Sequence, residues 1–309
     1  MIPPGSVPKR IVLSRKGFDS SWGGCASPIL DYEMISLPIP EHNLNYRKSL
    51  FDGHCPENHL TYQDLKTTSE GKRAVELVLK LTKGIKESDC VHLDPDIRPG
   101  FRKREDMSSP LTFGQSGGSQ TELNKIEEGD LFLFFGWFRD ALADSGIARF
   151  DKKGSDMHVI WGWLQVSERL DLPSKLSRAR EIARHHPHVT HHVGRHPNCL
   201  YVAGNSLAFL PSYPGAGAFS RFHDGLSLSD LKSESRPRKR SHWRLPAFFK
   251  EMSISRIRKI SDWTREGDSI VGEAANHPGQ EFIFETNGHE VQVANWLEGI
   301  FHGVGQEPQ

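Results

Sequence analysis

The sequence predicts a mixed α+β fold built on a curved, largely antiparallel sheet or a small barrel elaborated with helices. Strand-like and helix-like patterns do not alternate strictly along the chain, which disfavours a doubly wound parallel sheet. Two apolar aromatic runs, Leu131 to Phe138 and His158 to Val166, are spaced for an antiparallel pair joined by a long excursion. Each run contains a glycine, Gly136 or Gly162, where a sheet can bend without crowding its side chains.

The remaining elements follow from local periodicity. The stretch "SEGKRAVELVLKLTKGI" keeps its apolar residues on one side and begins with Ser69 as a plausible cap, so it predicts a helix. Further helices are predicted in "PSKLSRAREIARHH" and "EVQVANWLEGIF". Further strands are predicted at Ile11 to Leu13, Met34 to Ile39, Cys199 to Ala203 and Glu281 to Glu285.

Length and composition favour one elaborated domain over residues 1–309, with a division into 9–125 and 126–305 as the alternative. Lys plus Arg and Asp plus Glu both number 39, so only a local patch could hold an anionic partner. The cysteines lie far apart without a CxxC pair, which predicts reduced, unpaired thiols. With no leader pattern and no long apolar run, the expected location is cytoplasmic and no membrane partner is expected.

The first strand is followed by "RKGFDSSWGG", a polar and glycine-rich loop. A strand end that passes Arg15, Lys16 and Asp19 to such a loop is a common place for a site. The arginine and lysine would neutralise phosphate, and the aspartate would act as an acid, a base or a metal ligand. A plain connection is the competing interpretation.

The segment "CVHLDPDIRPGF" alternates His92, Asp94 and Asp96, so in an extended conformation the three side chains project to one face. An imidazole and two carboxylates suit a divalent cation, with Asp19 as a further ligand or a base. Pro95 and Pro99 make a rigid turn equally natural, with the aspartates capping backbone amides. The cofactor therefore stays unknown, with a divalent metal as one option.

Three other segments are candidates. In "LTFGQSGGSQTEL", Gly117 and its neighbours precede a short helix whose amides could attract an anion, while Gln115 could read a polar edge. The basic loop "KSESRPRKRSHWR" is the most plausible nucleic-acid contact, through Arg236, Arg238, Lys239, Arg240 and Trp243. A solvated charge run is the competing interpretation of that loop.

Six histidines crowd into "HHPHVTHHVGRHPN", the densest histidine run in the chain. Their spacing matches no standard zinc arrangement, so the run is predicted to be an exposed or partly packed polar loop. Its members are His185, His186, His188, His191, His192 and His196.

The central strands are similar to barrels of the PUA, ASCH and EVE superfamily, in which a "GD" turn precedes a strand. Taken together, "SRKGFDSSWGGCASPI", "SLPIP", "HLDPD", "FGQSGG", "GDLFLFFGWF", "HVIWGWLQV", "SHWRLPAFF" and "GQEFIFE" resemble the nucleotide modification associated domain family, third class, over about Lys9 to Phe301. The resemblance implies work alongside systems that modify bases in DNA. The chain departs from the family pattern at Gly118 and Glu122.

The resemblance implies one functional surface that gathers residues from the whole chain. It comprises Arg15, Gly17, Phe18, Asp19, His92, Asp94, Asp96, Gln115, Gly117, Trp137, Arg244, Gln280 and Glu281. Asp19, His92, Asp94 and Asp96 are the expected catalytic group, and the others, with Lys16, the substrate contacts.

The leading hypothesis is a nucleotide or DNA-base modification protein that acts on or binds its ligand in this polar cleft. One alternative is a non-catalytic reader that stacks a modified base on Trp137, Trp161 and Trp163. The second is a metal-dependent hydrolase of a small phosphorylated or glycosylated substrate. The sequence leaves open whether the chain is catalytic at all. Convergence of the Asp19, Asp94 and Asp96 carboxylates would favour an enzyme, and their dispersion beside an aromatic cage would favour a reader.

Overall fold

The two aromatic runs pair as antiparallel neighbours, which confirms that prediction. In the computed structural model they form β7 (Leu131–Asp144) and β9 (Met157–Leu172), with Phe134 opposite Gly162 and a register shift between Phe134 and Phe135. The structure describes residues 1–41, 55, 59–66, 68–82, 84–102, 107–144, 147–172, 174–190, 192–232, 239–255, 257, 260–274 and 281–303.

Within the described residues the main sheet has ten strands, six of which run in the order β15-β1-β7-β9-β10-β6. Most pairs are antiparallel, but β1 and β2 both run parallel to β7. The mixed α+β class and the curved sheet were predicted correctly. Among the described residues the strand order stays open, so the small closed barrel is not formed. The path strands are β15 (Glu281–Glu285), β1 (Arg10–Arg15), β10 (Asn198–Ala203) and β6 (Thr112–Ser116), with β2 (Ser27–Leu30), β3 (Glu33–Met34), β8 (Ile147–Phe150) and β11 (Ala216–Ala218) beside them.

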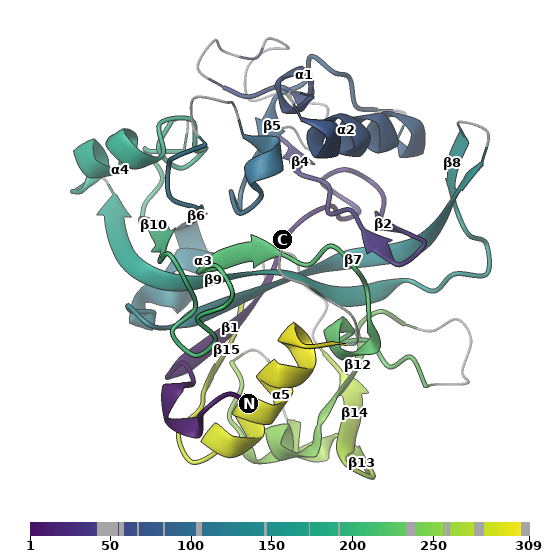
Figure 1. The fold of residues 1–309 in the computed structure, drawn as a ribbon, viewed down its shortest axis with the longest axis vertical. Helices are drawn as coiled ribbons and strands as arrows, with labels where there is room; N and C mark the ends of the chain where they lie inside the picture. The colour runs from purple at the N-terminus through teal and green to yellow at the C-terminus, as the bar shows by residue number, and fades with distance from the viewer. Residues whose placement is uncertain are drawn as a thin grey trace.

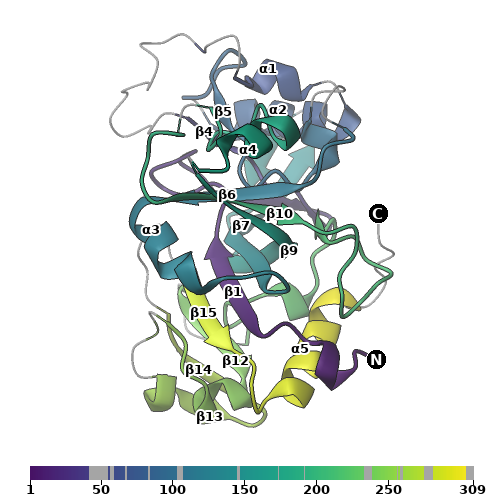
Figure 2. The same ribbon diagram turned by 90° about the vertical axis from the view of Figure 1, so that its left-hand side faces the viewer.

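In the described part of the chain two small sheets lie on opposite sides of this sheet, one beside several α-helices and the other beside a single α-helix (Figures 1 and 2). Helices α1, α2 and α4 and strands β4 and β5 lie on one side, and α5 with β12, β13 and β14 lies on the other. The helices are α1 (Tyr62–Leu65), α2 (Ser69–Leu81), α3 (Gly117–Glu122), α4 (Leu176–Ile182) and α5 (Glu290–Phe301). The small sheets comprise β4 (Ile39–Pro40) and β5 (Val91–His92), and β12 (His242–Pro246), β13 (Thr264–Glu266) and β14 (Ser269–Glu273). Short 3-10 helices lie at Pro4–Ser6, Pro99–Phe101, Leu123–Lys125, Asp224–Leu226, Ala247–Glu251 and Ile260–Asp262.

Aromatic side chains fill the core between these layers. On one face of β7, Phe132 and Phe134 pack on Phe113 of β6, with centroids 4.9 and 5.1 Å apart. On the other face, Phe135 packs edge-on against Trp243 of β12 at 5.3 Å. Alternate residues of the same strand therefore fill two cores, because successive side chains point to opposite faces of a sheet.

Three local expectations need correction. Helix α2 is capped by Thr68, whose side chain accepts from the Gly71 amide, and Ser69 is already its first residue. The expected strand from Met34 to Ile39 is interrupted, because Pro38 has no amide hydrogen to donate to a ladder. The thiols of Cys55 and Cys90 form a disulfide across 35 residues, with Cα atoms 5.3 Å apart, so the prediction that all cysteines are reduced is wrong. Cys25 and Cys199 are free.

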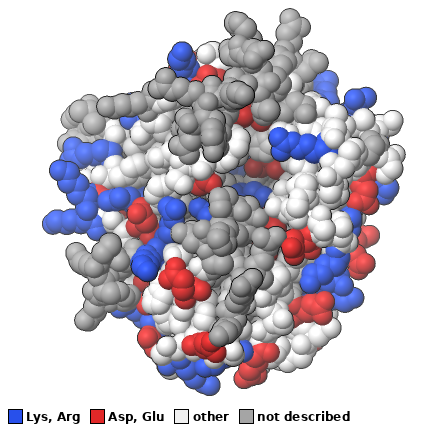
Figure 3. All heavy atoms as spheres, turned by 180° about the vertical axis from the view of Figure 1, so that it is seen from behind, with Lys and Arg blue, Asp and Glu red and all other residues white. Residues whose placement is uncertain are grey.

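Charges of both signs are interspersed on the face shown in Figure 3, in keeping with the balanced composition. None of the helices in the described part of the chain has the length and apolar character to cross a membrane.

The "GD" turn before β7 owes its structure to Asp130. Gly129 adopts a φ of 89°, which glycine accommodates, and the Asp130 carboxylate accepts from the amides of Arg10 and Glu127 at 3.0 and 2.9 Å. The Arg10 guanidinium lies 3.3 Å from the same carboxylate, which is 2 % exposed. One buried side chain therefore joins the turn to the start of β1.

Asp130→Ala is expected to lower the free energy of unfolding by about 2 kcal/mol, because it leaves two amides and a guanidinium without their acceptor. The control is Glu127→Ala, since the Glu127 side chain is 67 % exposed and shares the same arginine. Its effect should stay within about 0.5 kcal/mol. Urea unfolding measures both, and equal effects would show that the turn does not depend on Asp130.

Candidate metal centre

The central histidines of the run are buried, so the prediction of an exposed or partly packed polar loop is wrong for them. His186, His188 and His192 are 3, 4 and 5 % exposed, whereas His196 is exposed. The run follows α4 and turns back into β10, where Asn198 donates to the carbonyls of His188 and His192 at 3.2 and 3.1 Å. His191 lies outside the described residues.

The Asp94 carboxylate lies at the centre of these histidines. Its Oδ1 atom accepts from the Gly114 amide of β6 at 2.8 Å. Two residues further on, the backbone amides and carbonyls of Asp96 and Thr112 form a pair of hydrogen bonds, which also holds this segment against β6. Gly114 is needed here because a Cβ atom would lie 2.4 Å from the ring of His188. The absence of a side chain therefore lets β6 approach the cluster.

Asn198 determines where the His188 ring carries its hydrogen. The Asn198 amide nitrogen is used on two carbonyls, so its Oδ1 atom must accept from His188 Nδ1, 2.7 Å away. Burial lowers the pKa of His188 to about 3, so the ring is neutral and its Nε2 atom holds a lone pair. That lone pair lies 3.6 Å from Asp94 Oδ2, another acceptor.

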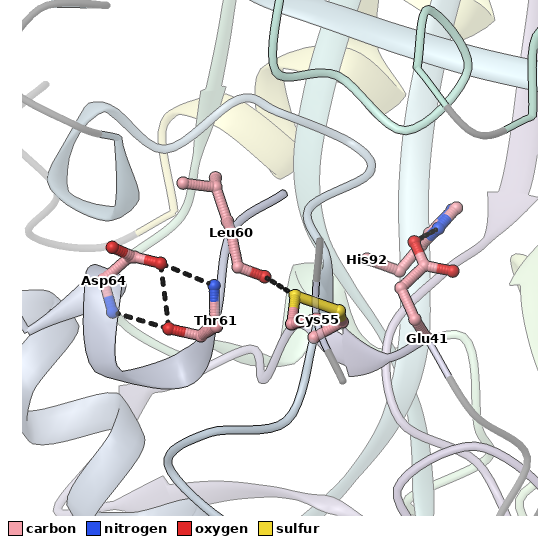
Figure 4. Close-up of a disulfide and its surroundings, with 7 residues drawn as sticks. Glu41, Cys55, Leu60, Thr61, Asp64 and His92 are labelled. Carbon is pink, nitrogen blue, oxygen red and sulfur yellow. Dashed lines mark hydrogen bonds and ion pairs between the residues drawn. A yellow bond between two sulfur atoms is a disulfide. The ribbon is translucent and has the colours of Figure 1, made fainter. Parts of the chain in front are cut away.

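His92 approaches the same carboxylate from β5. Its Nδ1 atom donates to Glu41 Oε1 at 2.6 Å, and its Nε2 atom lies 3.6 Å from Asp94 Oδ2. Burial would lower the pKa of His92, but Glu41 and Asp94 outweigh it and raise that pKa to about 10. Figure 4 shows Glu41 and His92 next to the Cys55 disulfide, which ends two residues before His92.

His186 supports Asp94 in a different way. The backbone amide of His188 donates to His186 Nδ1 at 3.2 Å, so the ring hydrogen is on Nε2, which faces Asp94 Oδ1 at 3.3 Å. Burial would raise the pKa of Asp94, but the neighbouring rings of His186, His92 and His188 outweigh burial and hold that pKa well below its usual range. Asp94 is therefore a buried anion.

The Nε2 atoms of His92 and His188 and the Asp94 carboxylate have the spacing of a cation site. One ligand atom from each residue lies within 4.8 Å of the other two. Ligands about 2.1 Å from a tetrahedral cation lie about 3.4 Å apart, close to the 3.6 Å seen between Asp94 and each imidazole. Glu41, His92 and His192 form a second such set. The first set fits better, because the Glu41 contact already uses Nδ1 of His92 and matches the carboxylate support usual for ligating histidines.

Two small cavities border this cluster. One is lined by Asp94 together with Gly17, Pro95, Arg98 and Trp161. The other is lined by Asp96, Arg102, His185 and His186. The first cavity brings the glycine loop after β1 to the HLDPD segment, although the two are far apart in the sequence.

The other two predicted carboxylates have partners away from Asp94. Asp19 accepts from the amides of Ser21 and Trp22 at 2.7 and 2.8 Å. Asp96 forms two hydrogen bonds with Arg102, both 2.8 Å long. The three carboxylates therefore have separate partners, and of the loop after β1 it is Gly17, two residues before Asp19, that lines the cavity next to Asp94.

A buried polar contact joins the two end strands of the main sheet. It consists of Lys16, Gln115 and Glu281. Glu281 is fully buried, and its Oε1 atom lies 3.2 Å from Lys16 Nζ and accepts from Gln115 Nε2 at 2.7 Å. Burial raises the pKa of Glu281 against the opposing effects of Lys16, Ser14 and Gln115. Because β6 and β15 are at opposite ends of the strand order, this contact shows how strongly the sheet curls.

The remaining predicted substrate contacts are dispersed. Phe18 is buried, Gly117 opens α3 with a φ of 65°, and Arg244 binds Asp230 and Glu266 at 2.6 and 2.5 Å. Trp137 is partly buried, with the Arg240 guanidinium 4.2 Å from its ring centroid. Gln280 lies outside the described residues.

The basic loop is only partly as predicted. Trp243 is fully buried and donates to His158 at 3.0 Å, so the prediction that it contacts nucleic acid is wrong. Its alternating position in β12 points it into the aromatic core. Lys239 is exposed and Arg240 is half-buried, while Arg236 and Arg238 lie outside the described residues.

The aromatic residues expected in a reader do not form an open cage among the described residues. Trp161 and Trp163 are each 5 % exposed, and their indole nitrogens donate to the carbonyls of Lys16 and Pro214 at 3.3 and 2.9 Å. Only Trp161 lines the cavity next to Asp94.

A family profile described as nucleotide modification associated domain 3 matches residues 10–285. The chain belongs to that family. No curated protein and no solved structure matches the chain significantly. Membership in nucleotide modification associated domain 3 places the protein with nucleotide modification systems, as the resemblance implied, and gives no specific activity.

Sequence reasoning on this nucleotide modification associated domain 3 protein missed Glu41, His186, His188, His192 and Asn198 as parts of the site. The histidine spacing matched no standard motif because the cluster is completed from β4, β5 and β10. The sequence did contain one signal that could have indicated the site. The histidine run directly precedes the strand predicted at Cys199 to Ala203, and the HLDPD segment offers a second group of ligand residues.

Gly114→Ala is expected to destabilise the protein by about 1–3 kcal/mol, because the added methyl group would displace His188 or β6. Gly118→Ala is the matched control, since a Cβ atom added there would have no other atom within 4 Å and alanine favours the helix. Thermal unfolding of both variants tests the contact. A Gly114→Ala variant as stable as Gly118→Ala would contradict the close approach.

Proposed function

We propose that this protein is a metal-dependent enzyme that modifies a nucleotide or a base in nucleic acid. The observation that carries the proposal is the set of His92, Asp94 and His188, which turns two imidazoles and one carboxylate towards one point. The family supports a nucleotide or nucleic-acid substrate. The ligand set supports a bound cation as the catalytic group. A cation there would polarise a substrate oxygen or lower the pKa of a bound water.

Donor and acceptor positions support a cation rather than a self-sufficient cluster. The His188 lone pair and the Asp94 carboxylate are both acceptors and lie 3.6 Å apart, outside the usual hydrogen-bond range of about 2.7–3.2 Å. A cation would satisfy both acceptors. It would also replace the hydrogen on Nε2 of His92, since a ligating imidazole must be free of that proton.

The neighbouring groups resemble the support that ligating residues need. Glu41 orients His92, Asn198 orients His188, and the Gly114 amide fixes Asp94. Two imidazoles with one carboxylate suit Zn²⁺ or Fe²⁺ better than Mg²⁺, which prefers oxygen ligands. Three protein ligands leave a position for water or substrate, and the cavity through Gly17 and Trp161 adjoins Asp94.

The purified protein is expected to bind close to one equivalent of Zn²⁺ or Fe²⁺, measured by elemental analysis after dialysis. Asp94→Asn and His188→Gln should each weaken binding by at least about tenfold, because each removes a ligand atom. His196→Gln should bind like the wild type, since His196 is an exposed member of the same run. Equal binding by all three variants would place any metal elsewhere.

Nucleosides from cells that express the protein should contain a changed nucleoside in mass spectrometry, and cells with Asp94→Asn should lack it. His196→Gln again provides the control, with protein levels and thermal unfolding measured for each variant. A nucleotide bound tightly by wild type and Asp94→Asn alike, with no changed nucleoside, would instead support the reader alternative.

A further inference from the structure

His158 is a buried histidine with a hydrogen-bond donor that no described residue accepts. Its ring lies on the face of the sheet opposite to the Lys16 side chain. His158, near the start of β9, is 2 % exposed, and its Nδ1 atom accepts from Trp243 Nε1 at 3.0 Å. The ring hydrogen of neutral His158 is therefore on Nε2. That atom is buried and has no hydrogen-bond partner within the described parts of the chain.

Two arginines share this face of the sheet with His158. Arg15 is opposite Phe135, and Trp137 is opposite His158, so strand alternation places these side chains on one face. The His158 ring contacts Phe135 at 5.3 Å, which agrees with that assignment. Arg240 reaches the same face by stacking on Trp137, 4.2 Å from its centroid.

Neither arginine has a hydrogen-bonded or ion-paired carboxylate among the described residues. The nearest acids have other partners, because Asp19 accepts from the Ser21 and Trp22 amides and Asp156 accepts from Trp137 Nε1 at 2.8 Å. Asp19 and Asp156 still act on the arginines at longer range.

The charges of Arg15 and Arg240 both act on His158, in keeping with the strand register that places Arg15, Trp137 and His158 on one face. Burial lowers the pKa of Arg15; Asp19 opposes this shift and Arg240 adds to it. Burial also lowers the pKa of His158 well below its usual range, and both arginines lower it further. One face of the sheet thus carries two cations with no carboxylate partner among the described residues, together with a neutral N–H donor, and an anion there would relieve their repulsion.

We propose that Arg15, Arg240 and the Nε2 hydrogen of His158 bind a phosphate group of a nucleotide or a nucleic-acid strand. Guanidinium groups present paired donors that match phosphate oxygens, and a neutral imidazole adds one directed donor. Trp137, which is only partly buried, contacts Arg240 on the same face and would lie near the bound phosphate. This site uses no residue of the proposed metal centre, so it goes beyond the proposed function and can fail independently of it.

The test is calorimetric titration of the full-length protein with inorganic phosphate, deoxyadenosine, deoxyadenosine monophosphate and a short single-stranded oligonucleotide. Arg15→Gln and Arg240→Gln should each weaken binding of the monophosphate by at least tenfold. Arg265→Gln, an exposed arginine on β13, is the matched control and should bind like the wild type. Binding of deoxyadenosine without its phosphate should be far weaker.

Stability in the absence of ligand separates this site from a structural role. Removing one of two mutually repelling cations should leave the melting temperature unchanged or raise it, whereas loss of a structural contact would lower it. Phosphate should raise the melting temperature of the wild type more than that of either variant. Should the Arg15 variant fail to fold, Arg240→Lys keeps the charge but lacks the paired donors, and it should also bind more weakly.

The two sources of phosphate are distinguished by salt. A free nucleotide is indicated if the monophosphate binds as tightly as the oligonucleotide, and a nucleic-acid strand if the oligonucleotide binds more tightly with a steep salt dependence. Wild-type binding of monophosphate by both glutamine variants, or deoxyadenosine binding as strong as monophosphate binding, would overturn the proposal.

Discussion

The contact between the Asp94 carboxylate and the Gly114 amide joins the main sheet to the histidine cluster. Asp94 is a buried anion, and a buried charge is costly unless nearby groups compensate it. The compensation comes from histidines on a segment about a hundred residues further along the chain, held in place by Asn198 of β10. The site therefore forms only when β6, β10 and the HLDPD segment have all assembled.

Curling of the sheet has a second consequence. It brings Gln115 of β6 to Glu281 of β15, with Lys16 between them, so the open strand order is closed by side chains rather than by backbone. Alternation along β1 then places Lys16 inside the curl and Arg15 outside it. The end of β1 therefore borders two regions: the cavity beside Asp94 on one face of the sheet, and the arginines near Trp137 on the other.

Much of the fold could be predicted because strand and helix periodicity is local. The pairing of the Leu131 and His158 runs followed from composition and spacing, and so did the mixed class. The site could be predicted only in part, since His92 and Asp94 stand in one recognisable motif while His188 and Glu41 join them through tertiary contacts. Trp243 was predicted to contact nucleic acid because its sequence neighbours are basic. It is instead buried, because it belongs to β12, a strand whose alternate residues point into the core.

Anomalous diffraction from crystals soaked in Zn²⁺ would show whether His92, Asp94 and His188 hold one cation. We expect a single strong anomalous peak about 2.0–2.2 Å from the Nε2 atoms of His92 and His188 and from an Asp94 oxygen. Glu41 and Asn198 should keep their contacts with the two rings. A peak at other residues, or no peak while His92 and Asp94 form a direct hydrogen bond, would contradict the proposed metal site.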